Sequence, residues 1–323
     1  SLSGIVSANA TNAPAENMIL TINGSGLRGG DPTTIIAAGY TASGNATGNK
    51  LQVNGSYAFK TLHAGYSQSG SVDKNQVVIQ NNRSDDDNKT EFGNIYGGYS
   101  NASGNASGNA TGNSIVVKAD SVAEASSRTL YGGYANGSGA KVEDNFVVVE
   151  TGASVGFFIR SGHGSSISEA NGNYVRIEKD ASVEGRIYGA TTSRNASDNY
   201  VEIRGTVTGD VSAVVGSSLK PSENPTINNT RVTLDGAKVV GNVYAIDTQT
   251  AISATGTLVS LTNSTVTGFV RLAATPSVTG DYKFTGVNTV GYIQNDGNST
   301  FTFHIGEENA DAAVLSLTSE GYG

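Results

Sequence analysis

The sequence contains no cysteine and no tryptophan, and it has only one methionine and five prolines among 323 residues. Without cysteine no disulfide can staple the fold, so its stability must come from burial and hydrogen bonding. The absence of cysteine also suits a protein that crosses a membrane unfolded, because no premature disulfide can block its passage.

Basic charge is scarce as well. The chain has 20 Lys and Arg against 28 Asp and Glu, a formal net charge of −8, and no run of basic residues. A nucleic-acid partner is not expected, since it would need a basic face. No apolar run approaches the roughly 20 residues of a membrane span, so we expect no direct membrane insertion. No signal peptide opens the sequence, and we expect a mature product or an excised piece.

Glycine and β-forming residues make up much of what is present. The 42 glycines are about double the usual share of about 7%. The hydrophobic 37% is mostly Val, Ile, Leu, Ala and Tyr, which favours strands. Charged residues are only 15%, which argues against disorder by charge repulsion.

A repeat covers nearly the whole chain. The stretch IYGGYSNASGNASGNATGNSIVVKADS, which begins at Ile95, aligns with LYGGYANGSGAKVEDNFVVVETGASV, which begins at Leu130. Stronger and weaker copies together begin at Ile36, Leu62, Ile95, Leu130, Ile159, Ile187, Val211, Val243, Val270 and Ile293. A period of 20 to 50 residues is typical of a solenoid, in which each copy buries its apolar face only by stacking on its neighbours.

Each copy has the same parts. An apolar residue, a variable residue and a small residue form a first strand, and a polar loop follows. An Asn then opens a second strand with strict alternation, as Asn113 does before Ile115 and Val117. A turn with Gly, such as Gly209, leads into the next copy. Alternation predicts half-buried strands.

These features predict an all-β fold, a right-handed parallel β-helix of about ten rungs over residues 33–323. Residues 1–32 match the repeat poorly and are expected to form an irregular N-terminal rung or cap. The Asn that opens each second strand is expected to form a ladder with amide-to-amide hydrogen bonds between rungs. The simpler alternative is that Asn only favours turns. The predicted members are Asn49, Asn75, Asn113, Asn145, Asn173 and Asn199.

The repeat resembles a known family. Apolar-YGGY, followed by a Gly/Asn loop and N-x-V-x-I, is best matched over residues 92–134 and 183–211 and more weakly from Ile36 to about Ile305. It is similar to the passenger region of type V autotransporters, in particular the large repetitive adhesins of Gram-negative bacteria. The resemblance implies export through an outer-membrane β-barrel and display on the cell surface. No barrel-like strands close the sequence, so we expect a fragment that lacks the C-terminal barrel.

No pattern indicates catalysis. The only acidic run, Asp85 to Asp87, lacks the Gly and the final Glu of a calcium loop. His63, His163 and His304 are scattered, and the first two occupy repeat positions that suit surface or stacking variants. We therefore predict no catalytic residue, no metal site, no cofactor and no enzyme activity.

Tyrosine marks two positions of the repeat. Alternation places the residue after the first apolar one outward, and this position holds Tyr96, Tyr131, Tyr188 and Tyr244. The second position holds Tyr40, Tyr66, Tyr99 and Tyr134. Parity suggests that these point inward, but the preceding glycines allow a bend, so their side stays open. Tyr96, Tyr131, Tyr188, Tyr244, Tyr99 and Tyr134 are the candidate binding residues, with stacking between rungs as the alternative.

The sequence thus predicts a non-catalytic adhesin on a bacterial cell surface. Its expected partners are a host-cell or bacterial surface protein or glycan, or another copy of itself. Loops at residues 80–91, 100–112 and 215–229 are further candidates for recognition. The alternatives are a stalk that presents another region, a secreted toxin passenger that oligomerises on membranes, and a carbohydrate-active β-helix enzyme.

Overall fold

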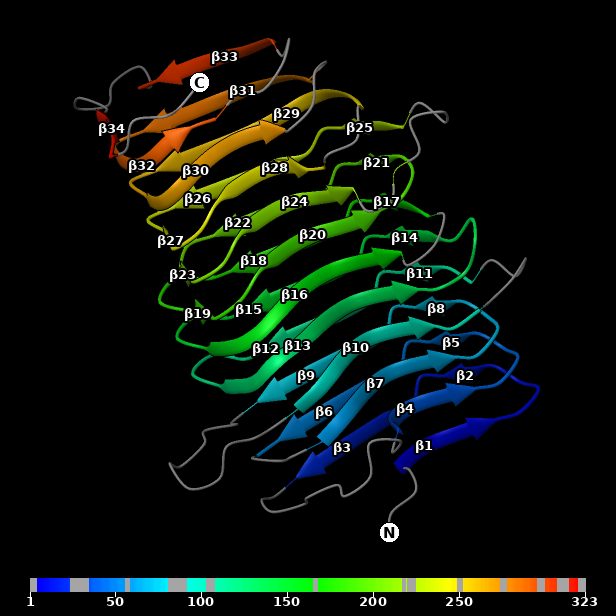
Figure 1. Ribbon diagram of the computed structural model, residues 1–323. Coiled ribbons are helices and arrows are strands. Elements are labelled where there is room, and N and C mark those ends of the chain that lie inside the picture. Colours follow the sequence, from blue (N-terminus) through cyan, green and yellow to red (C-terminus); the bar gives the residue numbers. More distant parts are fainter. Residues whose placement is uncertain are drawn as a thin grey trace.

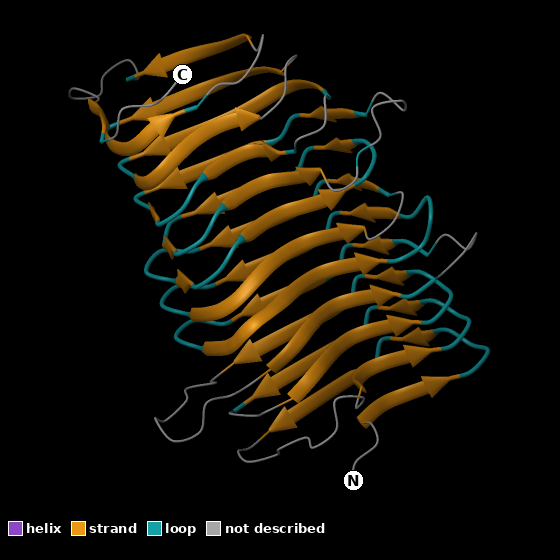
Figure 2. Cartoon of the chain, in the orientation of Figure 1, coloured by secondary structure: helices purple, strands orange, loops and turns teal. Residues whose placement is uncertain are grey.

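The computed structural model describes residues 5–23, 35–55, 59–80, 92–102, 108–164, 168–216, 219, 225–248, 252–273, 278–294, 300–306 and 314–318. These residues form a parallel β-solenoid with no helix (Figures 1 and 2). The chain winds through two facing sheets, rung upon rung, from β1 at one end to β33 and β34 at the other (Figure 1). The predicted fold class is therefore confirmed.

Sheet A contains the first strand of each rung. Its members are β1 (Ile5–Ala10), β4 (Ile35–Thr41), β7 (Phe59–Ser67), β10 (Phe92–Ser100), β13 (Val122–Ala135), β16 (Ser154–Gly164), β19 (Ser182–Val183), β20 (Ile187–Thr192), β23 (Thr206–Val207), β24 (Val211–Gly216), β27 (Lys238–Val239), β28 (Val243–Asp247), β30 (Thr265–Ala273), β32 (Val287–Ile293) and β34 (Val314–Leu317).

Sheet B contains the remaining strands. They are β2 (Ala15–Glu16), β3 (Ile19–Asn23), β5 (Ala46–Thr47), β6 (Lys50–Asn54), β8 (Val72–Asp73), β9 (Gln76–Gln80), β11 (Ala110–Thr111), β12 (Ser114–Val117), β14 (Lys141–Glu143), β15 (Phe146–Val149), β17 (Glu169–Asn171), β18 (Tyr174–Ile177), β21 (Ala196–Ser197), β22 (Tyr200–Ile203), β25 (Thr226–Asn228), β26 (Arg231–Asp235), β29 (Ser253–Thr262), β31 (Val278–Thr285) and β33 (Thr300–Ile305).

The register confirms the repeat alignment residue by residue. Ile95 is the Cα partner of Leu62 on one side and of Leu130 on the other. The same pairing links every aligned start from Ile36 to Ile293. Loops of different length therefore do not disturb the register. They occur where the chain passes from one sheet to the other, outside the stacked strands.

The first rung was expected to be an irregular rung or cap. Its described residues contain β1, β2 and β3, and these pair in parallel with β4, β5 and β6. Ile5 is the partner of Ile36 at the first position of the repeat. Residues 1–4 and 24–34 lie outside the described part of the chain.

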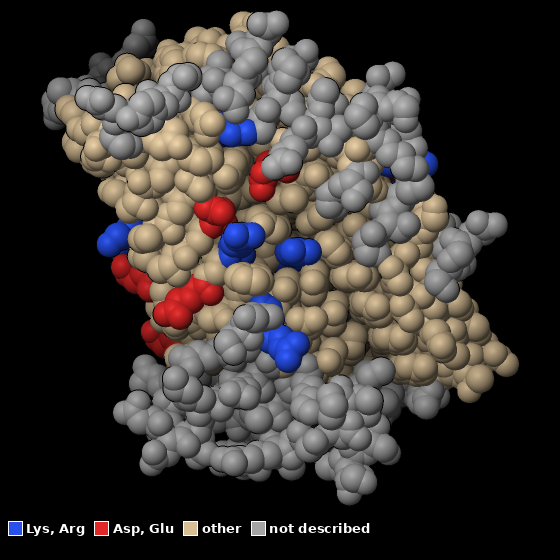
Figure 3. Space-filling view, in the orientation of Figure 1, with Lys and Arg blue, Asp and Glu red and all other residues tan. Residues whose placement is uncertain are grey.

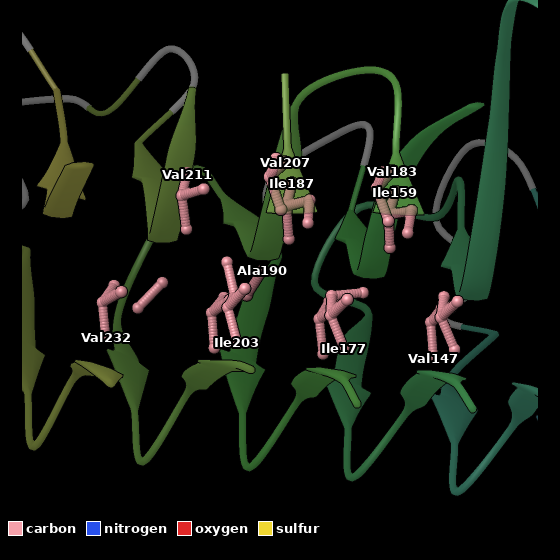
Figure 4. Close-up of a cluster of buried hydrophobic side chains, with 14 of the residues drawn as sticks. Val147, Ile159, Ile177, Val183, Ile187, Ala190, Ile203, Val207, Val211 and Val232 are labelled. Atoms are coloured by element: carbon pink, nitrogen blue, oxygen red, sulfur yellow. The ribbon is translucent and has the colours of Figure 1, made fainter. Parts of the chain in front are cut away.

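The core is built from the inward residues of both sheets. Ile177 and Ile203 from sheet B meet Ile159 and Ile187 from sheet A inside the coil (Figure 4). All four are fully buried. Because each rung repeats the same inward positions, the main core is a continuous cluster along the rod rather than a globular centre. A second, smaller buried cluster contains Ala46, Val72, Ala110, Ala135, Ala140 and Val142.

The predicted Asn ladder is confirmed. Each amide donates from Nδ2 to Oδ1 of the next Asn, at 2.8 Å from Asn49 to Asn75 and 2.9 Å from Asn173 to Asn199. The same oxygen also accepts a hydrogen bond from the backbone N–H of the preceding ladder Asn, one rung away, as Asn145 Oδ1 does from Asn113 N at 3.0 Å. The ladder is buried, so these bonds satisfy groups that water cannot reach.

A left-handed residue precedes each ladder position. Positive φ values of about +50° to +65° occur at Gly48, Lys74, Gly112, Asp144, Gly172 and Asp198. This conformation turns the chain sharply between the two strands of sheet B. It aims the next side chain, the ladder Asn, into the coil.

Candidate binding surface on the outer face of sheet A

Two rows of side chains run along the outer face of sheet A. Row 1 is the position after the first apolar residue, and in register it holds His63, Tyr96, Tyr131, Arg160, Tyr188, Ser212, Tyr244 and Arg271. Row 2 holds Tyr40, Tyr66, Tyr99, Tyr134, His163, Thr191, Val215 and Asp247.

Both rows lie on the same face. The rings of Tyr96 and Tyr99, from row 1 and row 2, are in contact with centroids 4.9 Å apart. The inward side suggested by parity for row 2 is therefore wrong. The reason is that Gly97 and Gly98 both face the interior, Gly97 against the backbone of Ser114 and Gly98 against Asn113. Two successive inward positions break the alternation and return row 2 to the outside.

The tyrosine rings of successive rungs stack face to face. Tyr96 stacks on Tyr131 with centroids 4.9 Å apart and planes 5° from parallel. Tyr40 stacks on Tyr66 at 5.1 Å and 5°. Because the stacking direction follows the rod axis, ring edges rather than ring faces point outward. The rows thus stabilise the coil and leave edges and hydroxyl groups for a partner.

The six candidate tyrosines do not form one cluster. Tyr96, Tyr131, Tyr99 and Tyr134 are in mutual contact. Arg160 interrupts row 1 before Tyr188, and Ser212 separates Tyr188 from Tyr244. Tyr244 instead packs against Phe269, with centroids 5.1 Å apart.

Burial keeps the tyrosines neutral. Desolvation, together with neighbouring tyrosines, raises the pKa of Tyr99 to about 12 and raises that of Tyr96 further. Their hydroxyl groups therefore act as hydrogen-bond donors and acceptors, as Tyr99 does when it donates to Asn101 Oδ1 at 3.1 Å.

The two histidines in these rows are stacking members, one of the two roles considered for them. His63 is only 2% exposed and stacks on Tyr96 with centroids 4.8 Å apart. His163 contacts Tyr134 at 4.8 Å. Desolvation lowers the pKa of each to about 3, and the charge of Arg160 adds to the effect at His163. Both rings are therefore uncharged near neutral pH.

Charged residues beyond the tyrosine rows were missed by sequence reasoning. Lys/Arg and Asp/Glu side chains lie near one another in the middle of this face, amid a largely uncharged surface (Figure 3). One ion pair lies beside row 1, where Arg186 precedes Tyr188: Arg186 Nε is 3.8 Å from Asp210 Oδ2. The only sequence signal was that Arg160 and Arg271 stand at row 1 positions that hold Tyr in other rungs.

The outer face of sheet B is built differently. A short column stacks Phe146, Tyr174 and Tyr200, and the guanidinium of Arg231 lies 4.4 Å from the Tyr200 centroid. Beside it, Arg204 bonds Glu202 at 2.8 Å within a network of ion pairs. Its arginine–carboxylate pairs neutralise one another.

No group of three or more His, Cys, Asp or Glu that could hold a metal ion occurs in the described part of the chain. The acidic run at Asp85 to Asp87 lies outside the described residues, as do parts of the loops at 80–91, 100–112 and 215–229. The described residues also contain no helix that is long and apolar enough to cross a membrane.

Comparison with known proteins gives no match to any family, to any curated protein or to any solved structure.

Proposed function

We propose that this chain is a non-catalytic adhesive rod, a passenger fragment displayed on a bacterial cell surface. It binds a host-cell or bacterial surface protein or glycan, or another copy of itself, through the outer face of sheet A. The observation that carries the proposal is the pair of straight, mostly uncharged rows of ring edges and hydroxyl groups along the rod.

The rows suit binding rather than chemistry. Tyrosine offers contact area and hydrogen bonds at a small cost in conformational entropy. Over four successive rungs row 2 presents the same group, from Tyr40 to Tyr134, which favours an extended partner through multivalent contact. The display of the rod outside the cell is supported by the sequence resemblance and by the absence of cysteine.

The test is adhesion of beads coated with the purified chain, alone and mixed with target cells. Clumping of beads indicates self-association, and attachment to cells indicates a heterotypic partner. A Tyr99→Phe, Tyr134→Phe double variant keeps both rings but removes two hydroxyl groups. We expect it to reduce adhesion several-fold, since each lost hydrogen bond contributes about 1 kcal/mol.

A Tyr174→Phe, Tyr200→Phe double variant is the matched control, because it removes two hydroxyl groups from a stacked pair on the outer face of sheet B. Equal adhesion of the Tyr99→Phe, Tyr134→Phe variant and the wild type would place the contact elsewhere. If wild-type beads neither clump nor attach, the proposal fails and the rod is a stalk for another region.

A further inference from the structure

The tyrosine rows are interrupted by a patch of different chemistry. It contains Phe158 and Arg160 on β16, and Arg186 and Tyr188 on the next rung. Phe158 and Arg160 are two residues apart on the same strand and face outward together, while Ile159 between them is buried.

Arg160 is an arginine without a carboxylate partner among the described residues. Its guanidinium lies 5.3 Å from the Tyr188 centroid and 3.5 Å from His163 Nδ1. Its Nε is buried and has no hydrogen-bond partner. This is unlike Arg176 and Arg204 on sheet B, which bond Glu202 at 3.3 Å and 2.8 Å. Within the described part of this acidic chain, Arg160 thus lies against two rings and forms no ion pair.

The surroundings of Arg160 offer donors rather than acceptors. When His163 Nδ1 accepts from Arg160, the proton of this neutral imidazole lies on Nε2, which then donates. Arg186, which hydrogen-bonds the Tyr188 side chain, adds a second guanidinium one rung away. Its carboxylate neighbours are Asp210, at 3.8 Å, and Asp247, and the Arg186 side chain is 59% exposed. A planar oxyanion matches such a set, because the arginine fork binds carboxylate or sulfate oxygens in pairs.

Phe158 supplies an apolar surface beside these donors. Phe158 is 39% exposed, and with the described residues it makes none of the ring contacts that close the faces of the tyrosines. An open aromatic ring next to a guanidinium suits a ligand with one anionic group and one apolar face, which describes an acidic sugar.

We propose that Phe158, Arg160, Arg186 and Tyr188 form a binding site for a carboxylated or sulfated sugar unit of an acidic polysaccharide. Arg160 binds the oxyanion, and Phe158 packs against the C–H face of the sugar ring. The site deepens the adhesive function proposed above and names the class of glycan that this face of the rod recognises.

The test is direct binding of the whole chain to polygalacturonate, to dextran sulfate and to neutral dextran at fixed ionic strength. We expect binding to an acidic polymer and none to neutral dextran, and the stronger acidic polymer identifies carboxylate or sulfate. Arg160→Gln should weaken this binding about tenfold or more, because a charge-assisted pair is lost. Phe158→Ala should weaken it about three- to tenfold.

Arg231→Gln is the matched control, since Arg231 also lies over a tyrosine ring but on the outer face of sheet B. The affinity of Arg231→Gln for the acidic polymer should stay within about twofold of that of the wild type. Thermal unfolding verifies that each variant is folded. Equal loss in Arg231→Gln, an unchanged affinity in Arg160→Gln, or no binding of acidic polymers by the wild type would overturn the site.

The adhesion assay separates this site from the wider proposal. If Arg160→Gln binds no polymer yet its beads still adhere, adhesion does not depend on this site, and Arg160 is no part of the adhesive contact. If wild-type beads do not adhere while the soluble chain binds the polymer, the site stands and the adhesive function falls.

Discussion

Asn113 occupies the space into which a side chain on Gly98 would project. A Cβ on Gly98 would lie 2.3 Å from Asn113 Oδ1, and the same relationship joins Gly133 to Asn145 and Gly162 to Asn173. One rung further, Ala190 and Asn199 hold these positions, and then Val214 and Thr230. Asn199 faces an alanine and donates only to backbone oxygens, whereas each Asn that donates to a next ladder Asn faces a glycine. The second Gly of the YGGY motif therefore accompanies the Asn-to-Asn bonds of the ladder.

The first prediction follows from this contact. Gly98→Ala should lower the free energy of unfolding by about 1–3 kcal/mol, since the buried Asn113 has no room to move. Combining it with Asn113→Thr imitates the Val214 and Thr230 pair. In urea unfolding we expect the double variant to be more stable than the sum of the two single effects. Strict additivity would show that the two side chains do not compete for space.

The second prediction concerns the ladder itself. Asn145 Oδ1 accepts from both Asn113 N and Asn113 Nδ2, each at 3.0 Å. Asn145→Ala leaves the backbone N–H of Asn113 and one of its two Nδ2 protons without an acceptor, while Val72 O still accepts from Nδ2 at 3.1 Å, and it should cost about 2–5 kcal/mol in urea unfolding. Asn54→Ala removes an exposed hydrogen bond from the Asn54 side-chain amide to Asn23 Oδ1 and should cost less than about 1 kcal/mol. Similar costs for the two variants would contradict a structural role for the ladder.

The third prediction concerns pH. In the folded chain burial lowers the pKa of His63 to about 3 from its ordinary value of 6.5, so the unfolded chain binds more protons between these values. The free energy of unfolding should therefore decrease as pH falls below 6.5 towards 3. His63→Phe keeps a stacked ring without this titration and should show a smaller loss of Tm between pH 7 and pH 4.

The control for that experiment is His304→Gln, because His304 is half exposed at the last rung. Its acid-induced loss of Tm should match that of the wild type. An identical pH profile in His63→Phe and wild type would show that His63 is protonated without cost in the folded chain.

The fourth prediction separates ring stacking from the hydroxyl group. Tyr96 contacts His63, Tyr99, Tyr131 and Tyr134 through its ring, and its hydroxyl accepts from Asn94 Nδ2 at 3.3 Å. Tyr96→Ala should lower the free energy of unfolding by about 2–4 kcal/mol, whereas Tyr96→Phe should change it by less than about 1 kcal/mol. Urea unfolding measures both, and a neutral Tyr96→Ala would exclude row 1 from stabilising the coil.

Much of the architecture follows from local patterns. The apolar starts, the Asn before each alternating strand and the outward position of Tyr96 and Tyr131 could all be predicted, because each depends on the period-two geometry of a strand and on stacking of equal units. In the weak copies at Val211 and Val270, too, the register is that of the alignment.

Other features needed the three-dimensional contacts. Parity misplaced Tyr99 because Gly97 and Gly98 both face inward, against Ser114 on β12 and against Asn113 in the turn before β12. The burial of His63 depends on rings from neighbouring rungs. The contacts of the Arg160 guanidinium likewise depend on folding, since it lies against Tyr188 of the next rung and His163 of its own strand.

The sequence by itself thus determined the repeat, the parallel coil and the ladder of amides, because these arise from spacing within one copy and from the identity of successive copies. Only the tertiary structure decided which faces of the tyrosines are closed and which side chains surround Arg160. The physical reason is that exposure and charge pairing are properties of neighbours in space, and in a solenoid those neighbours lie a whole rung apart along the chain.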